Sequence, residues 1–310
     1  MIKYALGTSL LAVFFVGAAM AQSARTFVSG QGKDKGSCSQ TAPCRTFTQA
    51  ISQTSAGGAV VALDSATYTP FTVTKALTVE APLGAAVTVS SGDGVDIDAG
   101  ANDTVILRGL TINNQGSSGN GIVLNTAATL HIEHCVVNAF AEFGMSGIAV
   151  AGPASVFVKD TIARDNYNGV SVTMGSAAGV TATLTLERVH LDANRIGLSI
   201  VTEAGQLVNG AVQSSSASGN GAAGFLINAD AGGTISMNID NCLLTNSGIG
   251  LVVESSNTST AAAYIAFCTL SHNTVNGFDI GGTGAVFSRG NNTLSDNGPN
   301  QGSLTALASQ

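Results

Sequence analysis

The sequence predicts an all-β protein: a single-stranded, right-handed parallel β-helix, built as a three-sheet solenoid of about 26 residues per coil with a short N-terminal capping helix. Two repeating phrases carry this prediction. The first phrase is Gly, an apolar residue, any residue and a second apolar residue. It recurs once per coil at a nearly constant interval and begins at Gly94, Gly121, Gly147, Gly169, Gly197, Gly224, Gly250 and Gly277.

The second phrase keeps step with the first and places apolar residues at relative positions 1, 3, 6 and 8. This pattern describes two alternating strands separated by a two-residue outward bend, because the bend resets the alternation. Each repeat therefore holds three short strands. Copies of the phrase cover 105–112, 130–137, 156–163 and 184–191, with more degenerate ones at 237–244 and 263–270.

A repeat of three short strands cannot bury its own apolar face, so successive repeats must stack on one another. Stacking in register at about 4.8 Å per rung produces three parallel sheets. A sandwich or propeller would require closely and evenly spaced hairpin turns, and the chain lacks that pattern. Parallel crossover connections are nearly always right-handed, which sets the expected hand of the coil.

The N-terminus resembles an export signal. Lys3 precedes an apolar run, and Ala19-Met20-Ala21 provides a small-x-small cleavage site, so we expect cleavage after Ala21 and a secreted or periplasmic protein. The mature form is expected to have no membrane span. Its 11 basic and 19 acidic residues give a net charge of −8, which argues against nucleic acid as a partner.

The chain is expected to divide into four segments. Within the second of them, Phe47, Ala50 and Ile51 have helical spacing, and a short helix there would cover the open apolar end of the first coil. The segments are a signal peptide at 1–21, an N-terminal cap with a disulfide loop at 22–58, the β-helix at 59–298 and a C-terminal tail at 299–310.

Five cysteines follow the signal. Cys38 and Cys44 enclose a short loop, so a disulfide is expected in an oxidising compartment. Cys135, Cys242 and Cys268 all occupy relative position 6 of the second phrase, an inward column, and we interpret them as core residues. A Cys242–Cys268 disulfide stays open as the alternative, and at least one of these three thiols must remain unpaired within a monomer.

Asparagines gather in the turns before the Gly phrase. Asn166, Asn194, Asn220 and Asn273 occupy equivalent positions, and Asn246 lies near the corresponding place in another turn. Asn tolerates left-handed backbone and can bond its counterpart in the next rung, so we expect a partial asparagine ladder. Attachment of a glycan or a metal is the alternative.

Several stretches look like the N-terminal cap and the coils of the pectin-lyase-like right-handed β-helix superfamily. The mature chain resembles a group of exported bacterial β-helix repeat proteins within it, and this resemblance implies the fold without implying a particular activity. The stretches that carry the resemblance are 43–51, 57–61, 66–68, 73–79, 103–110 and 290–297.

The resemblance also implies which site motifs an enzyme of this superfamily would show. The chain lacks the Asn-Thr-Asp, Asp-Asp, Gly-His-Gly and Arg-Ile-Lys set of polygalacturonases, and the Gln-Asp-Thr motif of pectin methylesterases. It also lacks the Asp-Pro-His-Glu motif of alginate epimerases, and Pro70 replaces the glutamate of a Gly-x-Tyr-x-Glu motif. Catalytic residues therefore cannot be transferred from these enzymes.

The repeat allows outward-facing columns to be searched for chemistry. A general acid and base cannot be built from the middle of the Gly-phrase column, which is small or apolar. That column is Asp96, Val123, Ala149, Ser171, Ser199, Leu226, Val252 and Asp279.

The two-residue bend supplies two further columns, and these do carry charges. The first begins Arg108, Glu133, Lys159, Glu187, so each charge meets opposite charges above and below it. We interpret it as an exposed ion-pair ladder. If a catalytic cluster exists, its best members are Glu133, His134, Lys159, Asp160, Glu187 and Arg188.

Two metal sites are weaker alternatives. His131 and His134 would both point outward across the bend and could bind zinc, but a fourth ligand at a defined spacing is missing. Asp93, Asp96 and Asp98 form an acidic patch with one imperfect match to a calcium-binding repeat. We interpret them as solvated turn residues and expect no cofactor, with calcium as the alternative.

Two classes of function remain. We favour a non-enzymatic exported β-helix that binds polysaccharide or another cell-surface partner such as a glycan, because the enzyme motifs are missing and the middle of the Gly-phrase column carries no charge. The alternative is a polysaccharide lyase that acts on an acidic polysaccharide through the bend cluster. Tyr167 and Tyr264 are the candidate exposed aromatics for stacking on sugars. The ligand, the oligomeric state and the choice between periplasm and exterior stay open.

Overall fold

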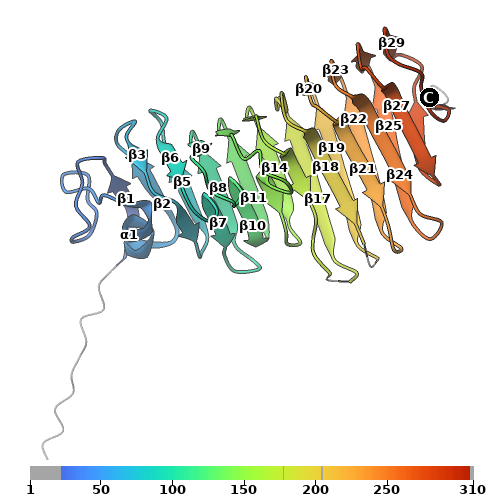
Figure 1. The fold of residues 1–310 in the computed structure, drawn as a ribbon. Coiled ribbons are helices and arrows are strands. Elements are labelled where there is room, and N and C mark those ends of the chain that lie inside the picture. The colour runs from blue at the N-terminus through green and yellow to red at the C-terminus, as the bar shows by residue number, and fades with distance from the viewer. Residues whose placement is uncertain (1–21, 177, 204, 308–310) are drawn as a thin grey trace, which may run out of the picture.

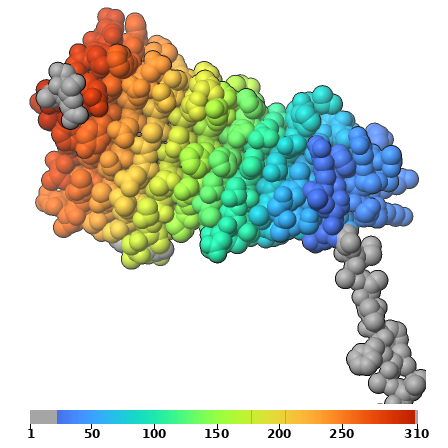
Figure 2. Space-filling model, turned by 180° about the vertical axis from the view of Figure 1, so that it is seen from behind, coloured from blue at the N-terminus to red at the C-terminus, as the bar shows by residue number. Residues whose placement is uncertain are grey.

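The computed structural model describes residues 22–307 with the exception of 177 and 204. The expected signal peptide at 1–21 lies outside the described residues. Figure 1 shows a rod in which strands stack one after another from the blue N-terminal end to the red C-terminal end. Figure 2 shows the same succession on the surface, so neighbouring surface regions come from neighbouring parts of the sequence. None of the described helices is long and apolar enough to cross a membrane.

The largest sheet has twelve parallel strands and contains the first half of every second-phrase copy. In spatial order these strands are β1 (Ser23–Val28), β2 (Thr54–Ala62), β5 (Leu77–Glu80), β8 (Thr104–Arg108), β11 (Thr129–Glu133), β14 (Ser155–Lys159), β17 (Thr181–Glu187), β19 (Leu207–Gln213), β22 (Thr234–Asp240), β25 (Thr260–Ala266), β28 (Ala285–Ser288) and β30 (Thr305–Ala306). The sequence did not predict β1, which lies in the segment expected to form the cap.

The second sheet has nine strands and contains all eight Gly phrases, preceded by one strand without a glycine. Nine strands correspond to nine turns of the solenoid. They are β4 (Phe71–Val73), β7 (Val95–Asp98), β10 (Ile122–Thr126), β13 (Ser146–Val150), β16 (Asn168–Val172), β18 (Ile196–Thr202), β21 (Ala223–Ala229), β24 (Ile249–Ser255) and β27 (Asn276–Gly282).

The third face is divided into a sheet of five strands and a sheet of four. The division falls at His190, which makes only single-residue bridges to Ile162 and Ser216. The expected third sheet is therefore interrupted at this rung. Its strands are β3 (Thr67–Tyr68), β6 (Ala86–Val89), β9 (Thr111–Asn114), β12 (Val136–Asn138), β15 (Ile162–Arg164), β20 (Ser216–Ser218), β23 (Leu243–Thr245), β26 (Thr269–Ser271) and β29 (Thr293–Ser295).

The three faces enclose one apolar core built from inward columns. Cys135, Cys242 and Cys268 are buried free thiols of this core, as predicted, and burial raises the pKa of Cys135 to about 11. Cys38 and Cys44 form the predicted disulfide.

One helix is present among the described residues, α1 (Phe47–Gln53), near the N-terminal end of the rod (Figure 1). Thr46 precedes it, and the Thr46 hydroxyl accepts a hydrogen bond from the Gln49 backbone N–H at 3.2 Å, which satisfies one of the open donors of the first turn. Phe47, Ala50 and Ile51 are buried, as their spacing predicts. The helix contacts β1, β2 and β4.

The asparagine ladder is confirmed in the turns between the third face and the nine-stranded sheet. The Asn194 side-chain oxygen accepts hydrogen bonds from the Asn166 backbone N–H and Nδ2, at 3.0 and 3.1 Å. Asn220 in turn accepts from the Asn194 N–H at 2.9 Å. The pattern repeats at Asn273, which bonds Asn297.

One position of the ladder differs from the expectation. Ser247, not Asn246, occupies the buried ladder position and donates its N–H to the Asn273 side chain at 3.0 Å. Asn246 comes one residue earlier, has a φ of 54° and is exposed. The left-handed backbone thus explains Asn246, and its side chain takes no part in the ladder.

Replacing Asn194 by Ala should lower the free energy of unfolding by about 3 kcal/mol, because the Asn166 N–H and the Ala163 carbonyl would lose buried hydrogen-bond partners. Chemical denaturation measures this change. Asn209→Ala is the control, since Asn209 is exposed on the twelve-stranded sheet and should cost little. Equal losses for the two variants would contradict a stabilising ladder.

Candidate functional site

The charged column at the bend is built by strand register. Glu80 pairs with Arg108, Arg108 with Glu133, Glu133 with Lys159, and Lys159 with Glu187. The sequence predicted this column from Arg108 onward and missed Glu80, because β5 ends without a full copy of the second phrase. The next residues in the column are Gln213 and Asp240, so the alternation of charge stops after Glu187.

The N-terminal half of the column forms one group of ion pairs. Arg108 Nη1 lies 3.1 Å from Glu80 Oε1, and Arg108 Nε lies 2.8 Å from Glu133 Oε2. Arg25 of β1 extends the group, with its guanidinium 3.8 Å from Glu80. These hydrogen-bonded carboxylates raise the pKa of Arg108 further.

The second group contains most of the predicted cluster. Lys159 Nζ lies 3.3 Å from Glu187 Oε2. Arg188 binds both carboxylate oxygens of Asp160, at 2.6 and 2.9 Å, and also pairs with Glu187. Asp160 and Arg188 reach one another because both have left-handed backbone, with φ of 48° and 52°, at equivalent positions of successive bends.

The ion pairs shift the pKa values of these side chains further from neutral pH. The Arg188 guanidinium, hydrogen-bonded to Asp160, holds the pKa of that carboxyl below its ordinary value, and Arg188 with Lys159 does the same for Glu187. The same contacts raise the pKa of Arg188. A general acid or base works best with a pKa near the operating pH, so Asp160 and Glu187 are poorly prepared for proton transfer near pH 7.

Ring side chains occupy a parallel column on the outer face of the twelve-stranded sheet. The His131 and Phe157 rings stack with their centroids 4.9 Å apart, and the Tyr264 and Phe287 rings stack at the same distance. Register places them in one column, which runs Ile106, His131, Phe157, Thr185, Ala211, Asn238, Tyr264 and Phe287.

A cavity of about 140 Å³ joins the ring column to the bend column. It brings together Glu133, Lys159 and Glu187 from the bend with His131 and Phe157 from the sheet face. His134 lies apart from it and lines a second cavity of about 340 Å³ with Glu80 and Arg108. The predicted cluster is therefore divided: His134 faces one cavity, while Asp160 and Arg188 line neither.

The sequence found only part of this surface. Tyr264 was predicted as an exposed aromatic, but the pairing of Phe157 with His131 and of Phe287 with Tyr264 was not. The signal was available, because Ile106, His131, Phe157 and Tyr264 all occupy relative position 2 of the second phrase. Tyr167, the other predicted aromatic, lies at a different corner, where its ring contacts Phe143 and Arg195.

The residues considered as alternative metal ligands do not form a metal site among the described residues. Within the described residues, no group of three or more His, Cys, Asp or Glu side chains is arranged to hold a metal ion. His131 and His134 line separate cavities. Asp93 accepts a hydrogen bond from the Asn120 N–H and Asp98 accepts one from Asn125, whereas the carboxylate of Asp96 has no protein donor among the described residues.

Replacing Arg188 by Gln should raise the pKa of Asp160 and Glu187 toward their ordinary values, as seen by NMR titration of the carboxyl carbons. A carboxyl with a lowered pKa stabilises the fold above its unfolded pKa and loses that contribution as the pH falls. The wild-type protein should therefore lose stability between about pH 5 and pH 2, and the variant should lose less.

Arg164→Gln is the matched control, because Arg164 forms an exposed pair with Asp165 outside the bend. It should leave both pKa values and the pH dependence unchanged. Identical titrations of Asp160 and Glu187 in the wild type and the Arg188 variant would show that the ion pairs do not form in solution.

Comparison with known proteins agrees with this architecture. The family model described as right handed beta helix region matches residues 93–263. No curated protein sequence matches the chain. Among solved structures, pectate lyase Pel9A is similar with a TM-score of 0.61 at 14% identity, covering 92% of this chain and 77% of that one.

A second solved structure is the A-module of mannuronan C-5 epimerase AlgE4 from Azotobacter vinelandii, with a TM-score of 0.38 at 12% identity, covering 82% of this chain and 89% of that one. At 14% identity the likeness to the pectate lyase shows the fold alone, and the TM-score of 0.38 for the epimerase is too low to indicate a shared fold. The family model spans more than half of the 310 residues. The chain therefore belongs to the right-handed β-helix family.

Proposed function

We propose that this protein is an exported, non-catalytic β-helix that binds polysaccharide along the outer face of its twelve-stranded sheet. The observation that carries the proposal is the ring column, in which one stacked pair of rings lies at each end of a strip of smaller side chains. The disulfide between Cys38 and Cys44 supports export, since such bonds persist in oxidising compartments.

The strip has the shape that a sugar chain requires. One face of Phe157 is covered by His131, while the next rung carries the smaller Thr185, and the 140 Å³ cavity lies there. Tyr264 likewise has Phe287 on one side and Asn238 on the other. Four rungs separate Phe157 from Tyr264, a span of about 19 Å at about 4.8 Å per rung, which is long enough for several sugar units.

The bend column supplies polar contacts beside the strip. Lys159 and Glu187 line the same cavity as Phe157 and can donate to and accept from sugar hydroxyls. Their charges compensate one another, so the surface does not demand a strongly charged ligand. Cell-surface glycans are within this proposal because they present the same chemistry.

The paired state of the charged cluster supports binding rather than catalysis. Asp160 and Glu187 are both held ionised by cations, and Arg188 is engaged with both of them. A lyase base would have to give up such a pair before it could take a proton. A binding surface can keep the pairs intact.

At the N-terminal end, we assign α1 the role of a cap over the first coil. The buried Phe47 ring contacts the rings of Tyr68 and Phe71, with centroids 4.9 and 4.6 Å apart, and so covers apolar side chains that no further coil would shield. The cap at 22–58, the coil at 59–298 and the tail at 299–310 remain the proposed division, with β1 as a strand that the cap contributes to the sheet.

Replacing Phe157 or Tyr264 by Ala should weaken polysaccharide binding about fivefold, the equivalent of about 1 kcal/mol of lost apolar contact for each ring. Affinity electrophoresis against a panel of polysaccharides measures this change. Phe143→Ala is the matched control, since Phe143 is 89% exposed but lies at another corner. Equal retention of all three variants would refute the proposed face.

The alternative function is a polysaccharide lyase acting on an acidic polysaccharide. The cavity that gathers Glu133, Lys159, Glu187 and His131 is the observation that favours it, since it combines carboxylates with a cation. The structural neighbour titled pectate lyase Pel9A has the same fold, but fold likeness does not transfer an activity.

Incubating the mature protein with acidic polysaccharides, with and without Ca²⁺, should give no unsaturated products and no new reducing ends. If products do form, Lys159→Ala and Arg188→Ala decide whether the cluster makes them. Lys35→Ala is the matched control, an exposed cation outside the cluster. Activity that only the two cluster variants abolish would replace the binding proposal with the lyase.

A further inference from the structure

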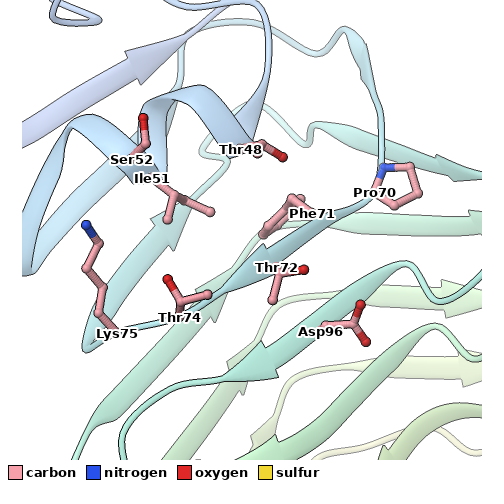
Figure 3. Close-up of a pocket in the computed structure, with 9 residues that line it drawn as sticks. All are labelled: Thr48, Ile51, Ser52, Pro70, Phe71, Thr72, Thr74, Lys75 and Asp96. Atoms are coloured by element: carbon pink, nitrogen blue, oxygen red, sulfur yellow. The ribbon is translucent and has the colours of Figure 1, made fainter.

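A cavity of about 410 Å³ lies at the N-terminal end of the rod, between α1 and β4 (Figure 3). Its volume falls in the range of about 300 to 1,000 Å³ that is typical of small-molecule sites. None of its residues belongs to the ring column or the bend column. It is lined by Thr48, Ile51, Ser52, Pro70, Phe71, Thr72, Thr74, Lys75 and Asp96.

The cavity follows the open edge of a sheet. β4 is the edge strand at the N-terminal end of the nine-stranded sheet and pairs only with β7. The Phe71 N–H bonds the Gly94 carbonyl at 3.2 Å. Because alternate residues of a parallel strand bond to opposite sides, the N–H and carbonyl of Thr72 point toward the open edge, where α1 lies. The cavity therefore offers a backbone donor and a backbone acceptor.

Hydroxyl groups line both walls. Figure 3 shows Thr48 and Ser52 on the helix and Thr72 and Thr74 on the strand segment opposite. Ser52 Oγ donates to the Gln49 carbonyl at 2.7 Å. The hydroxyls of the three threonines have no protein hydrogen-bond partner among the described residues. Each can both donate and accept.

Two opposite charges lie at opposite ends of the cavity (Figure 3). Lys75 Nζ donates to the Thr54 carbonyl at 2.6 Å and retains two further N–H donors. Asp96 presents a carboxylate with no donor among the described residues, and burial together with Asp93 and Asp98 raises its pKa. The cavity thus has one donor end and one acceptor end, with no net charge.

The floor is apolar. Ile51 and Phe71 are each 4% exposed, and Pro70 adjoins Phe71. An apolar floor with hydroxyls on the walls suits a ligand whose ring faces are carbon and whose rim is polar. A pyranose ring has this distribution of groups, and each of its hydroxyls can serve as donor toward Asp96 or as acceptor toward Lys75.

We propose that this cavity binds one uncharged saccharide unit, either a free sugar or the end of a glycan. The charges of Lys75 and Asp96 compensate one another, so the cavity has no net charge that would favour a uronate or an amino sugar over a neutral sugar. This site is separate from the polysaccharide face of the twelve-stranded sheet and does not depend on that proposal.

Isothermal titration of the mature protein with maltose, cellobiose and lactose tests the proposal. At least one of the three should bind saturably at one site per chain, in the millimolar range that a few hydrogen bonds support. Galacturonate and glucosamine should bind no more tightly than galactose and glucose, the neutral sugars of the same size. Repeating the titration with a neutral polysaccharide shows whether the source is a free sugar or a chain end.

Two substitutions locate the binding. Asp96→Ala should weaken disaccharide binding about tenfold, as expected for a hydrogen bond to a charged acceptor, and Thr72→Val about fivefold. Asp279→Ala is the matched control, because Asp279 occupies the same outward column at the other end of the nine-stranded sheet and should bind as the wild type does. Thermal unfolding shows whether each variant is folded. If Asp96→Ala does not fold, the binding measured for Thr72→Val decides the test.

Three results would overturn the proposal. The first is no saturable binding of any neutral disaccharide, and the second is tighter binding of galacturonate or glucosamine than of the neutral sugar of the same size. The third is an equal loss of disaccharide affinity in Asp96→Ala and Asp279→Ala. The ring-column variants separate this proposal from the first. Phe157→Ala and Tyr264→Ala should leave the disaccharide affinity unchanged. If a polysaccharide binds through these two rings while no disaccharide binds, the proposed polysaccharide face is supported and the proposed cavity site is refuted.

Discussion

In-register stacking of one rung on the next is the interaction on which the rest of this molecule depends. Each strand of the twelve- and nine-stranded sheets pairs in parallel with its counterpart one coil away, and the sequence offset between partners changes little along most of the rod. Since the offset is nearly constant, a residue type repeated in the sequence becomes a column in space. Main-chain hydrogen bonds set the geometry, and side chains then interact mostly with the equivalents above and below them.

Each kind of side chain uses its column differently. Buried asparagines bond one another and the turn backbone, which satisfies polar groups that the core would otherwise leave unpaired. Charges at the bend alternate and pair in the open, where each contact contributes little. Aromatic rings stack in pairs and expose the face that the neighbouring rung leaves uncovered.

Periodicity explains both what the sequence could predict and what it could not. The strands, the ladder and the charged column follow from residues repeated at a fixed interval, and Cys135, Cys242 and Cys268 were placed in the core by the same count. The repeat interval does not predict β1, Glu80 or the α1–β4 cavity, because they lie at the N-terminal end of the rod, where the repeat is not yet regular. Ser247 was missed because Ser replaces Asn at one ladder position, and the break at His190 because one rung lacks a full strand.

The same regularity indicates where ligand chemistry can reside. Within a complete column, a polar or charged side chain finds its partners among its own equivalents, as Lys159 does with Glu187 and Arg188 with Asp160. Groups without such partners arise where a column begins or changes residue type. Asp96 has Thr72 on one side and Val123 on the other, and neither neighbour donates a hydrogen bond to its carboxylate. Phe157 faces Thr185, so its column leaves one ring face open. A ligand gains most at such positions, because it supplies contacts that the stacked coils cannot supply for themselves.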